Sequence, residues 1–200
     1  MLYVWLFKLT AYLPLTLFYR IRIIGKENKP KGKCIFALNH SSAMDGTLIN
    51  VVFPLRRIYF LTTRKLFNCS KIHQWQLWQM GCRPSLSPSE DMETMMNIAG
   101  SMKKKEMIGF FSEGKIHHSV GNFMGGAVIL ALKTKLPLVP VYIKTAPFYK
   151  GGTQISFGEP IELEMKEYPT AEDIAELNDI LRSKVIKLSV NKGGKKNELQ

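Results

Sequence analysis

The chain has 200 residues, of which 46% are hydrophobic, and this length and composition suit one globular domain with a sizeable core. Its formal net charge of +12 at pH 7 favours an anionic partner, namely nucleic acid, an anionic membrane surface or a phosphorylated small molecule. We exclude nucleic acid, because the sequence has no recognisable binding module and no basic residues interleaved with aromatic ones, and we expect anionic membrane lipids and a phosphorylated ligand.

Residues 1–19 are almost wholly apolar and are interrupted by Lys8 and Pro14. No basic region precedes them and no small-residue cleavage site follows, so the segment is not a good signal peptide. A membrane-spanning helix needs roughly 20 apolar residues with few charges, which makes the segment borderline. Its aromatic residues and the following Arg20 and Arg22 favour a helix that lies in, or dips into, the cytoplasmic leaflet. The alternative is a helix packed on the core of its own domain.

The next part of the chain leads from a loop into a strand and then a helix. Residues 20–32 are polar and contain glycine and proline, which indicates a loop. Residues 34–38 form a short apolar run that predicts a buried strand. After a polar turn, apolar residues between positions 48 and 53 predict a helix that ends before Pro54.

The polar turn at residues 39–46 reads Asn-His-Ser-Ser-Ala-Met-Asp-Gly and places His40 five positions before Asp45. Asp45 could return onto the imidazole, fix its tautomer and stabilise the imidazolium when the other nitrogen takes a proton. A histidine supported in this way is a suitable general base for an alcohol, which is a poor nucleophile at neutral pH. The alternative is a capping box from Ser42 to Asp45, in which Asp45 only closes the N-terminus of the helix.

Beyond Pro54, apolar runs alternate with helical stripes. The runs predict strands at residues 57–62, 107–111 and 136–143, and a short strand pair at 155–161. Helices are predicted at residues 73–80, 87–102, 121–135 and 170–188, and the second and fourth of them open with capping boxes at residues 87–90 and 170–173. This alternation predicts an α/β domain with a central, mostly parallel mixed sheet flanked by helices.

Four blocks of the sequence resemble those of the glycerolipid acyltransferases, the 1-acylglycerol-3-phosphate (lysophosphatidic acid) acyltransferase family. The family has Asn-His-x4-Asp, a glycine-to-arginine block, Phe-Pro-Glu-Gly-Thr-Arg-Ser and a proline-bearing strand. Here the blocks fall, in the same order, at residues 39–45, 81–83, 111–117 and 136–141. The resemblance runs from about Ile23 to Pro160, and its first and third blocks together are specific.

The resemblance implies transfer of a fatty acyl group from acyl-CoA or acyl carrier protein to the hydroxyl of a lysophospholipid, most simply 1-acylglycerol-3-phosphate, which gives phosphatidic acid. His40 would remove the hydroxyl proton, and Asp45 would orient His40. Arg83 would bind the phosphate of the acceptor, because a guanidinium matches phosphate oxygens in a bidentate way. Glu113 and Gly114 would belong to the acceptor site.

Two departures from the family pattern fall in the third block. Ser112 replaces the usual proline, and Lys115-Ile116-His117 replaces Thr-Arg-Ser. The arginine expected at position 116 would help to hold phosphate, so we expect a lysine to supply the charge instead. Lys115 is the first candidate, and Lys133 and Lys135 are the alternatives. A different lysolipid or hydroxylated lipid acceptor is the alternative, and a non-catalytic lipid-binding protein of the membrane surface is an alternative of another class.

We divide the chain into a membrane-associating segment at residues 1–22, a glycerolipid acyltransferase domain at 23–190 and a disordered tail at 191–200. No metal-ligand cluster and no glycine-rich nucleotide loop is present, so we expect no metal and no cofactor beyond the acyl-CoA or acyl carrier protein co-substrate. The odd number of cysteines, Cys34, Cys69 and Cys82, favours free thiols in a reducing compartment. The predicted location is the cytoplasmic face of a membrane.

Overall fold

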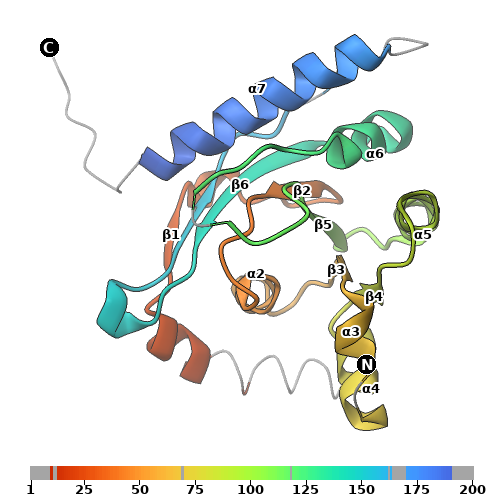
Figure 1. Cartoon of the computed structure of the whole chain (residues 1–200). Coiled ribbons are helices and arrows are strands. Elements are labelled where there is room, and N and C mark those ends of the chain that lie inside the picture. The colour runs from red at the N-terminus through yellow and green to blue at the C-terminus, as the bar shows by residue number, and fades with distance from the viewer. Residues whose placement is uncertain are drawn as a thin grey trace, which may run out of the picture.

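The structure, a computed structural model, describes residues 10, 13–68, 70–117, 119–161, 163 and 170–190. Its centre is a seven-stranded sheet with the strand order β1-β7-β6-β2-β5-β3-β4 (Figure 1). The strands are β1 (Arg22–Ile24), β2 (Ile35–Leu38), β3 (Ile58–Thr62), β4 (Cys82–Pro84), β5 (Met107–Phe111), β6 (Leu138–Lys144) and β7 (Gln154–Phe157). The helices are α2 (Asp45–Val52), α3 (Arg64–Phe67), α4 (Lys71–Gln79), α5 (Pro88–Ser101), α6 (Gly126–Thr134) and α7 (Ala171–Val190), with short 3-10 helices η1 (Lys26–Asn28) and η2 (Phe148–Lys150).

The sheet is mixed and mostly parallel. Only the pair β6–β7 is antiparallel among the paired strands of the described residues, and all other neighbours run parallel. The carboxyl ends of β2, β5 and β6 therefore meet at one edge of the sheet, where ligands bind in open sheets of this kind. The predicted α/β architecture with a central sheet flanked by helices is confirmed.

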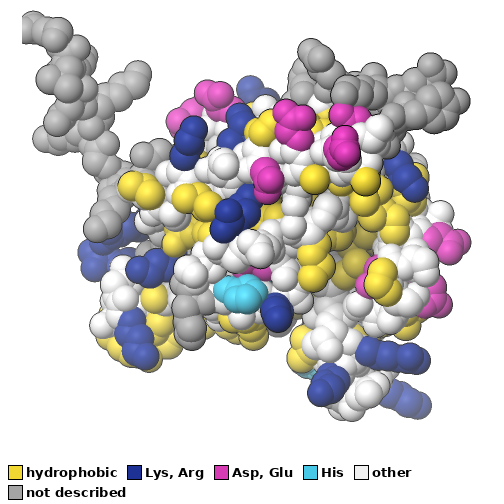
Figure 2. All heavy atoms as spheres, turned by 45° about the horizontal axis from the view of Figure 1, so that its top comes forward, with side chains coloured by type: hydrophobic (Ala, Val, Ile, Leu, Met, Phe, Trp, Pro, Cys, Tyr) yellow, Lys and Arg dark blue, Asp and Glu magenta, His cyan; other side chains and the backbone are white. Residues whose placement is uncertain are grey.

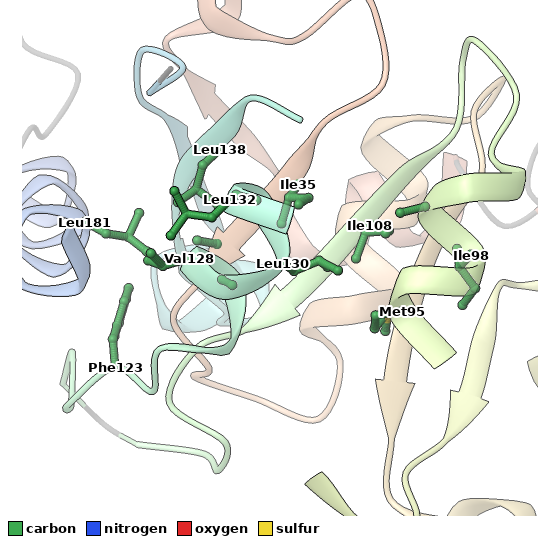
Figure 3. Packing of buried hydrophobic residues seen from close by; sticks show 14 of the residues in the cluster. Ile35, Met95, Ile98, Ile108, Phe123, Val128, Leu130, Leu132, Leu138 and Leu181 are labelled. Atoms are coloured by element: carbon green, nitrogen blue, oxygen red, sulfur yellow. The ribbon is translucent and has the colours of Figure 1, made fainter. Parts of the chain in front are cut away.

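Helices cover both faces of the sheet. On one face, α5, α6 and α7 bury a continuous apolar core with side chains of β2, β5 and β6, as Figure 3 shows for residues such as Met95, Leu130 and Leu181. On the other face, α2 and the helical residues 13–19 pack against Phe36, Leu38 and their neighbours. A strand that is buried on both faces needs apolar residues without alternation, which explains the run that marks β2.

Several elements differ from the sequence-based expectation. Residues 20–32 are not a loop throughout, because β1 lies within them and pairs with β7. The short elements β4 and α3 were not expected, and α6 begins at Gly126 and not at Gly121. In place of a strand pair at 155–161, β7 is followed by a single bridge between Leu138 and Ile161. The strands β1 and β4 and the bridge to Ile161 depend on partners distant in sequence, which local periodicity does not report.

The N-terminal helix at residues 13–19 has one packed side and one exposed side. Leu15 and Tyr19 pack against the core, whereas Leu13, Leu17 and Phe18 are exposed. None of the described helices is long and apolar enough to cross a bilayer. Most of the predicted membrane-associating segment, residues 1–9 and 11–12, and the predicted tail at 191–200 lie outside the described residues.

Cys34 and Cys82 are free thiols, and Cys69 lies outside the described residues. Cys34 is fully buried at the start of β2, and burial raises the pKa of its thiol to about 12. A thiol with such a pKa is not a nucleophile at neutral pH, so Cys34 is a core residue.

Candidate active site

The turn after β2 is attached to β6 by a side chain. Asn39 is buried, and its Nδ2 donates to the Ile143 carbonyl oxygen at 2.9 Å while its Oδ1 accepts from the Ile143 backbone N–H at 2.8 Å. The amide thus continues the hydrogen bonding between the two strands beyond the point where their backbones separate. This explains why an asparagine precedes the histidine, since both groups of the amide are used.

Asp45 is fully buried, and one of its oxygens supports both the histidine and the turn before α2. Its Oδ2 accepts from His40 Nδ1 at 2.9 Å and also from the backbone N–H groups of Ser41 and Ser42, at 2.7 and 2.9 Å. The bond to Ser42 N–H is half of the capping box that the sequence offers as an alternative. Asp45 therefore orients His40 and fixes the turn that leads into α2, whereas the N-cap position of α2 is Met44 and has no side-chain cap.

The imidazole of His40 is held flat against an aromatic ring. It stacks on Phe111 with ring centroids 4.2 Å apart and an interplanar angle of 23°, and Phe111 in turn stacks on Phe60. Because Nδ1 faces the Asp45 carboxylate, Nε2 is the nitrogen left to exchange a proton with a substrate. The side chain of His40 is 19% exposed, so its free edge can be reached from solvent.

Glu113 fixes the backbone of the same turn. Its carboxylate is only 2% exposed, and it accepts from His40 N–H at 2.8 Å through Oε2 and from Gly121 N–H at 2.6 Å through Oε1. The His40 carbonyl oxygen accepts from the backbone N–H of His117 at 2.8 Å. The third block therefore holds both backbone groups of His40. Glu113 thus lies beside His40, as the sequence predicted, and it positions the turn; its predicted role toward the acceptor stays a prediction.

Gly114 and Lys115 form the turn between Glu113 and His117. Gly114 has φ +68°, a left-handed conformation that disfavours a side chain, so its first requirement is the turn itself. Lys115 and Ile116 are exposed on the loop that bonds to His40, and Ile116 is 50% exposed. Lys115 thus lies two residues before His117, whose N–H bonds to the His40 carbonyl, and its predicted role toward phosphate stays a prediction.

Arg83 lies apart from this cluster. In the sheet register it pairs with Leu61, which belongs to the face covered by α5, α6 and α7, whereas Phe111 under His40 belongs to the other face. Its guanidinium lies over the rings of Trp78 and Tyr59, at 4.4 and 5.4 Å from their centroids. Burial, followed by the nearby Arg57, lowers the pKa of Arg83. The structure thus does not bring Arg83 to His40, and its predicted role stays without geometric support.

Thr145 is a residue of the site that the sequence analysis missed. Its Oγ1 donates to Asp45 Oδ1 at 2.5 Å, and its backbone N–H donates to Ser41 Oγ at 3.1 Å. It follows the last residue of β6, so the strand pairing of β6 with β2 brings it there. The only sequence signal was its place just beyond the proline-bearing fourth block.

We expect Thr145→Val to lower kcat about tenfold. KM for the acyl donor, KM for the acceptor and the melting temperature should stay nearly unchanged. Valine keeps the shape but removes the hydroxyl that fixes the second oxygen of Asp45, so the carboxylate holds His40 less firmly. Steady-state kinetics would check the separation of kcat from KM. Thr145→Ser, which keeps the hydroxyl, should restore most of kcat, and a serine variant as slow as the valine variant would contradict this role.

The sequence matches a known protein family. Residues 20–144 match the family model described as Acyltransferase. The chain belongs to the acyltransferase family. Within the described residues, no group of three or more histidine, cysteine or acidic side chains could hold a metal ion.

Two relatives of the chain are named for the same enzyme activity. The chain is 28% identical over 140 residues to the chloroplastic 1-acyl-sn-glycerol-3-phosphate acyltransferase BAT2 of Brassica napus, a match that covers 67% of this chain and 40% of that protein. It is 24% identical over 182 residues to the 1-acyl-sn-glycerol-3-phosphate acyltransferase of Bacillus subtilis, covering 84% of this chain and 87% of that protein. The chain thus spans about two fifths of the plant relative and most of the bacterial one.

The fold is shared with a solved structure of the family. The 1-acyl-sn-glycerophosphate (LPA) acyltransferase PlsC of Thermotoga maritima superposes with a TM-score of 0.60 at 21% sequence identity. The superposition covers 94% of this chain and 79% of that one. This similarity supports the mixed sheet flanked by helices that positions the His40 turn.

Proposed function

We propose that the protein is an O-acyltransferase that moves a fatty acyl group from acyl-CoA or acyl carrier protein to the hydroxyl of a lysophospholipid. The observation that carries this proposal is the His40–Asp45 pair, joined at 2.9 Å at the edge of the sheet with the other imidazole nitrogen left for a substrate. Membership of the acyltransferase family supports acyl transfer as the reaction type. The names of the Brassica and Bacillus relatives make 1-acylglycerol-3-phosphate the first acceptor to test.

The proposed chemistry is direct transfer. His40 Nε2 takes the proton of the acceptor hydroxyl while the oxygen attacks the thioester carbonyl, and a carbon–oxygen bond forms. The tetrahedral intermediate then collapses, the carbon–sulfur bond breaks, and the imidazolium returns the proton to the departing thiolate. The buried Asp45 carboxylate stabilises the imidazolium between these two proton transfers.

The serines of the turn are engaged in structural hydrogen bonds. Ser41 Oγ donates to Asp45 and accepts from the Thr145 N–H, while Ser42 Oγ accepts from the Met44 N–H. Neither hydroxyl bonds to the imidazole, as the nucleophile of an acyl-enzyme mechanism would. This arrangement supports direct transfer over a hydrolase-like route through an acyl-serine.

A turnover assay with labelled acyl donor and a panel of lysolipids tests the proposal. We expect acylated lysophosphatidic acid as the main product, identified by mass spectrometry. Release of free fatty acid as the main product would indicate a hydrolase. Lipid binding without turnover by any acyl-CoA or acyl carrier protein donor would contradict the enzyme proposal and favour a lipid-binding protein.

Lys115 is the cation that the geometry favours for the acceptor phosphate, because its loop bonds to His40 whereas Arg83 lies on the other face of the sheet. We expect Lys115→Ala to raise KM for lysophosphatidic acid about tenfold and to leave KM for the acyl donor nearly unchanged. Ile116→Arg, which restores the family arginine, should lower KM or leave it unchanged. Arg83→Ala should raise it less than Lys115→Ala does.

Lys103→Ala is the control for this series, because Lys103 is exposed before β5 at the opposite end of the strands. The proposal that Lys115 binds the acceptor phosphate fails if Lys115→Ala changes KM for lysophosphatidic acid no more than Lys103→Ala does. If a lysolipid without a phosphomonoester is then acylated faster than lysophosphatidic acid, the acceptor is a different lysolipid.

A further inference from the structure

A small open pocket lies at the same edge of the sheet as the His40 turn and is formed by other residues. It is lined by three cationic side chains, Arg22, Lys144 and Lys150, and by the turn Gly151–Gly152. Arg22 comes from β1, Lys144 from the end of β6 and Lys150 from η2, so three separate segments contribute one charge each. No function described above uses these residues.

The sheet register explains why the charges gather. Gln154 of β7 pairs with Arg22 on one side and with Lys144 on the other, so the three residues form a row across neighbouring strands. Residues paired in this way project from the same face of a sheet. Within the described part of the chain, neither Arg22, Lys144 nor Lys150 lies within ion-pair distance of an acidic side chain. Three cations that face one pocket without a counter-ion favour an anionic ligand.

The loop that closes the pocket is held in place by hydrogen bonds. Thr153 is buried, and its Oγ1 bonds to both the backbone N–H and the carbonyl of Ala146, at 3.1 and 2.9 Å. The Gly152 N–H donates to the Pro147 carbonyl, and the Thr153 N–H donates to the Tyr19 carbonyl. A ligand therefore meets a loop that is already ordered, which lowers the entropic cost of binding.

Exposed aromatic and aliphatic side chains flank the pocket. Phe148 and Tyr149, which precede Lys150, are 54% and 65% exposed, and Leu17 and Phe18 of the N-terminal helix are also exposed. The rings of Phe18 and Phe148 meet with centroids 6.1 Å apart, so the helix and η2 form one surface at the lower left of Figure 1. Figure 2 shows Lys and Arg side chains beside hydrophobic ones on this side of the molecule, while acidic side chains gather toward the top and right.

We propose that this surface docks on a membrane and that Arg22, Lys144 and Lys150 bind the phosphate of an anionic phospholipid headgroup. Phe148 and Tyr149, with the exposed side of the N-terminal helix, enter the interfacial region of the bilayer. Basic residues beside exposed aromatic ones are the pattern of surfaces that bind anionic membranes. The basic side chains thus contribute to membrane binding by charge, and the aromatic ones contribute by burying apolar surface.

This inference rests on the proposed function and deepens it, because the pocket and the His40 turn share one edge of the sheet. Lys144 ends β6, and the next residue, Thr145, bonds to Asp45. A bilayer bound at the pocket would therefore lie beside the edge at which His40 meets a substrate. A lysophospholipid acceptor resides in such a bilayer, so docking would shorten its path to the site.

Sedimentation of the full chain with vesicles tests how much the three cations contribute to membrane binding. We expect wild type to bind phosphatidylcholine vesicles that contain phosphatidylglycerol more tightly than pure phosphatidylcholine vesicles, and more weakly at high salt. The triple variant Arg22→Gln, Lys144→Gln, Lys150→Gln should lose on the order of 10-fold or more in affinity for the anionic vesicles. An unchanged melting temperature would show that the variant is folded.

The matched control removes the same charge elsewhere. Lys103→Gln, Lys104→Gln, Lys105→Gln changes three exposed residues that precede β5, at the opposite end of the strands from the pocket. We expect this variant to lose clearly less affinity than the pocket variant. Equal losses in the two triple variants, or no loss in either, would overturn the proposal.

Two further measurements separate the remaining explanations. Tyr149→Gln should reduce the binding that survives high salt, whereas Leu55→Gln, an exposed leucine at the other end of the strands, should not; equal effects would overturn the apolar part. Release of the protein from vesicles by millimolar glycerol 3-phosphate would assign the pocket to a soluble phosphate and overturn the lipid assignment. Vesicle binding needs no turnover, so a protein that docks but does not acylate would contradict only the proposed function.

Discussion

His40→Ala is expected to abolish measurable acyl transfer while leaving the fold intact. The variant removes the only group of the described turn that can accept the proton of the acceptor hydroxyl and return it to the thiolate, and general base catalysis is worth about 10²–10⁴-fold in rate. The ring is partly exposed and packs on Phe111 by one face, so alanine removes contacts at the surface without opening the core. The expected loss is therefore in kcat and not in stability.

The measurement is turnover of labelled acyl donor by the purified variant, with circular dichroism and the melting temperature as the test of folding. His73→Ala is the matched control, because His73 lies on α4 and belongs to neither the His40 turn nor the third block. This control should retain normal turnover. A folded His40→Ala protein that turns over at a rate close to wild type would disprove the mechanism.

The His40–Asp45 pair could be predicted from the sequence because its geometry is local. A strand followed by a turn and a helix fixes how a side chain five residues further on can return, so the spacing of His40 and Asp45 was sufficient. The order of the longer strands and helices also followed from local periodicity, since buried parallel strands are continuous apolar runs. The half of the capping box that forms, from Ser42 N–H to Asp45, is local for the same reason.

The rest of the site depends on pairing between distant strands. Thr145 reaches Asp45 only because β6 lies beside β2, and Glu113 reaches the His40 N–H because β5 lies on the other side of β2. The face on which Arg83 projects depends on the register of β4 against β3, and a shift by one residue would reverse it. A motif can name such residues, but their contacts follow from the sheet.

Asp45→Asn is expected to lower kcat by on the order of 10²-fold or more, although less than His40→Ala does, and to leave the fold stable. The asparagine oxygen can take the place of Oδ2 and accept from Ser41 and Ser42 N–H, as the carboxylate does. The amide nitrogen then faces the hydroxyls of Ser41 and Thr145, which can rotate to accept. The substitution thus removes the charge beside the imidazolium while His40 Nδ1 and the Ser41 and Ser42 N–H groups keep their acceptor.

Asp45→Ala separates this electrostatic role from the structural one. Alanine leaves the N–H groups of Ser41 and Ser42 without their acceptor, so it should lower the free energy of unfolding by roughly 1–3 kcal/mol in addition to the loss of kcat. Urea denaturation beside kinetics would show two variants that are both slow, of which only the alanine variant is destabilised. If the asparagine variant instead retains nearly full kcat, Asp45 serves only to fix the turn before α2, and the negative charge next to His40 has no part in the reaction.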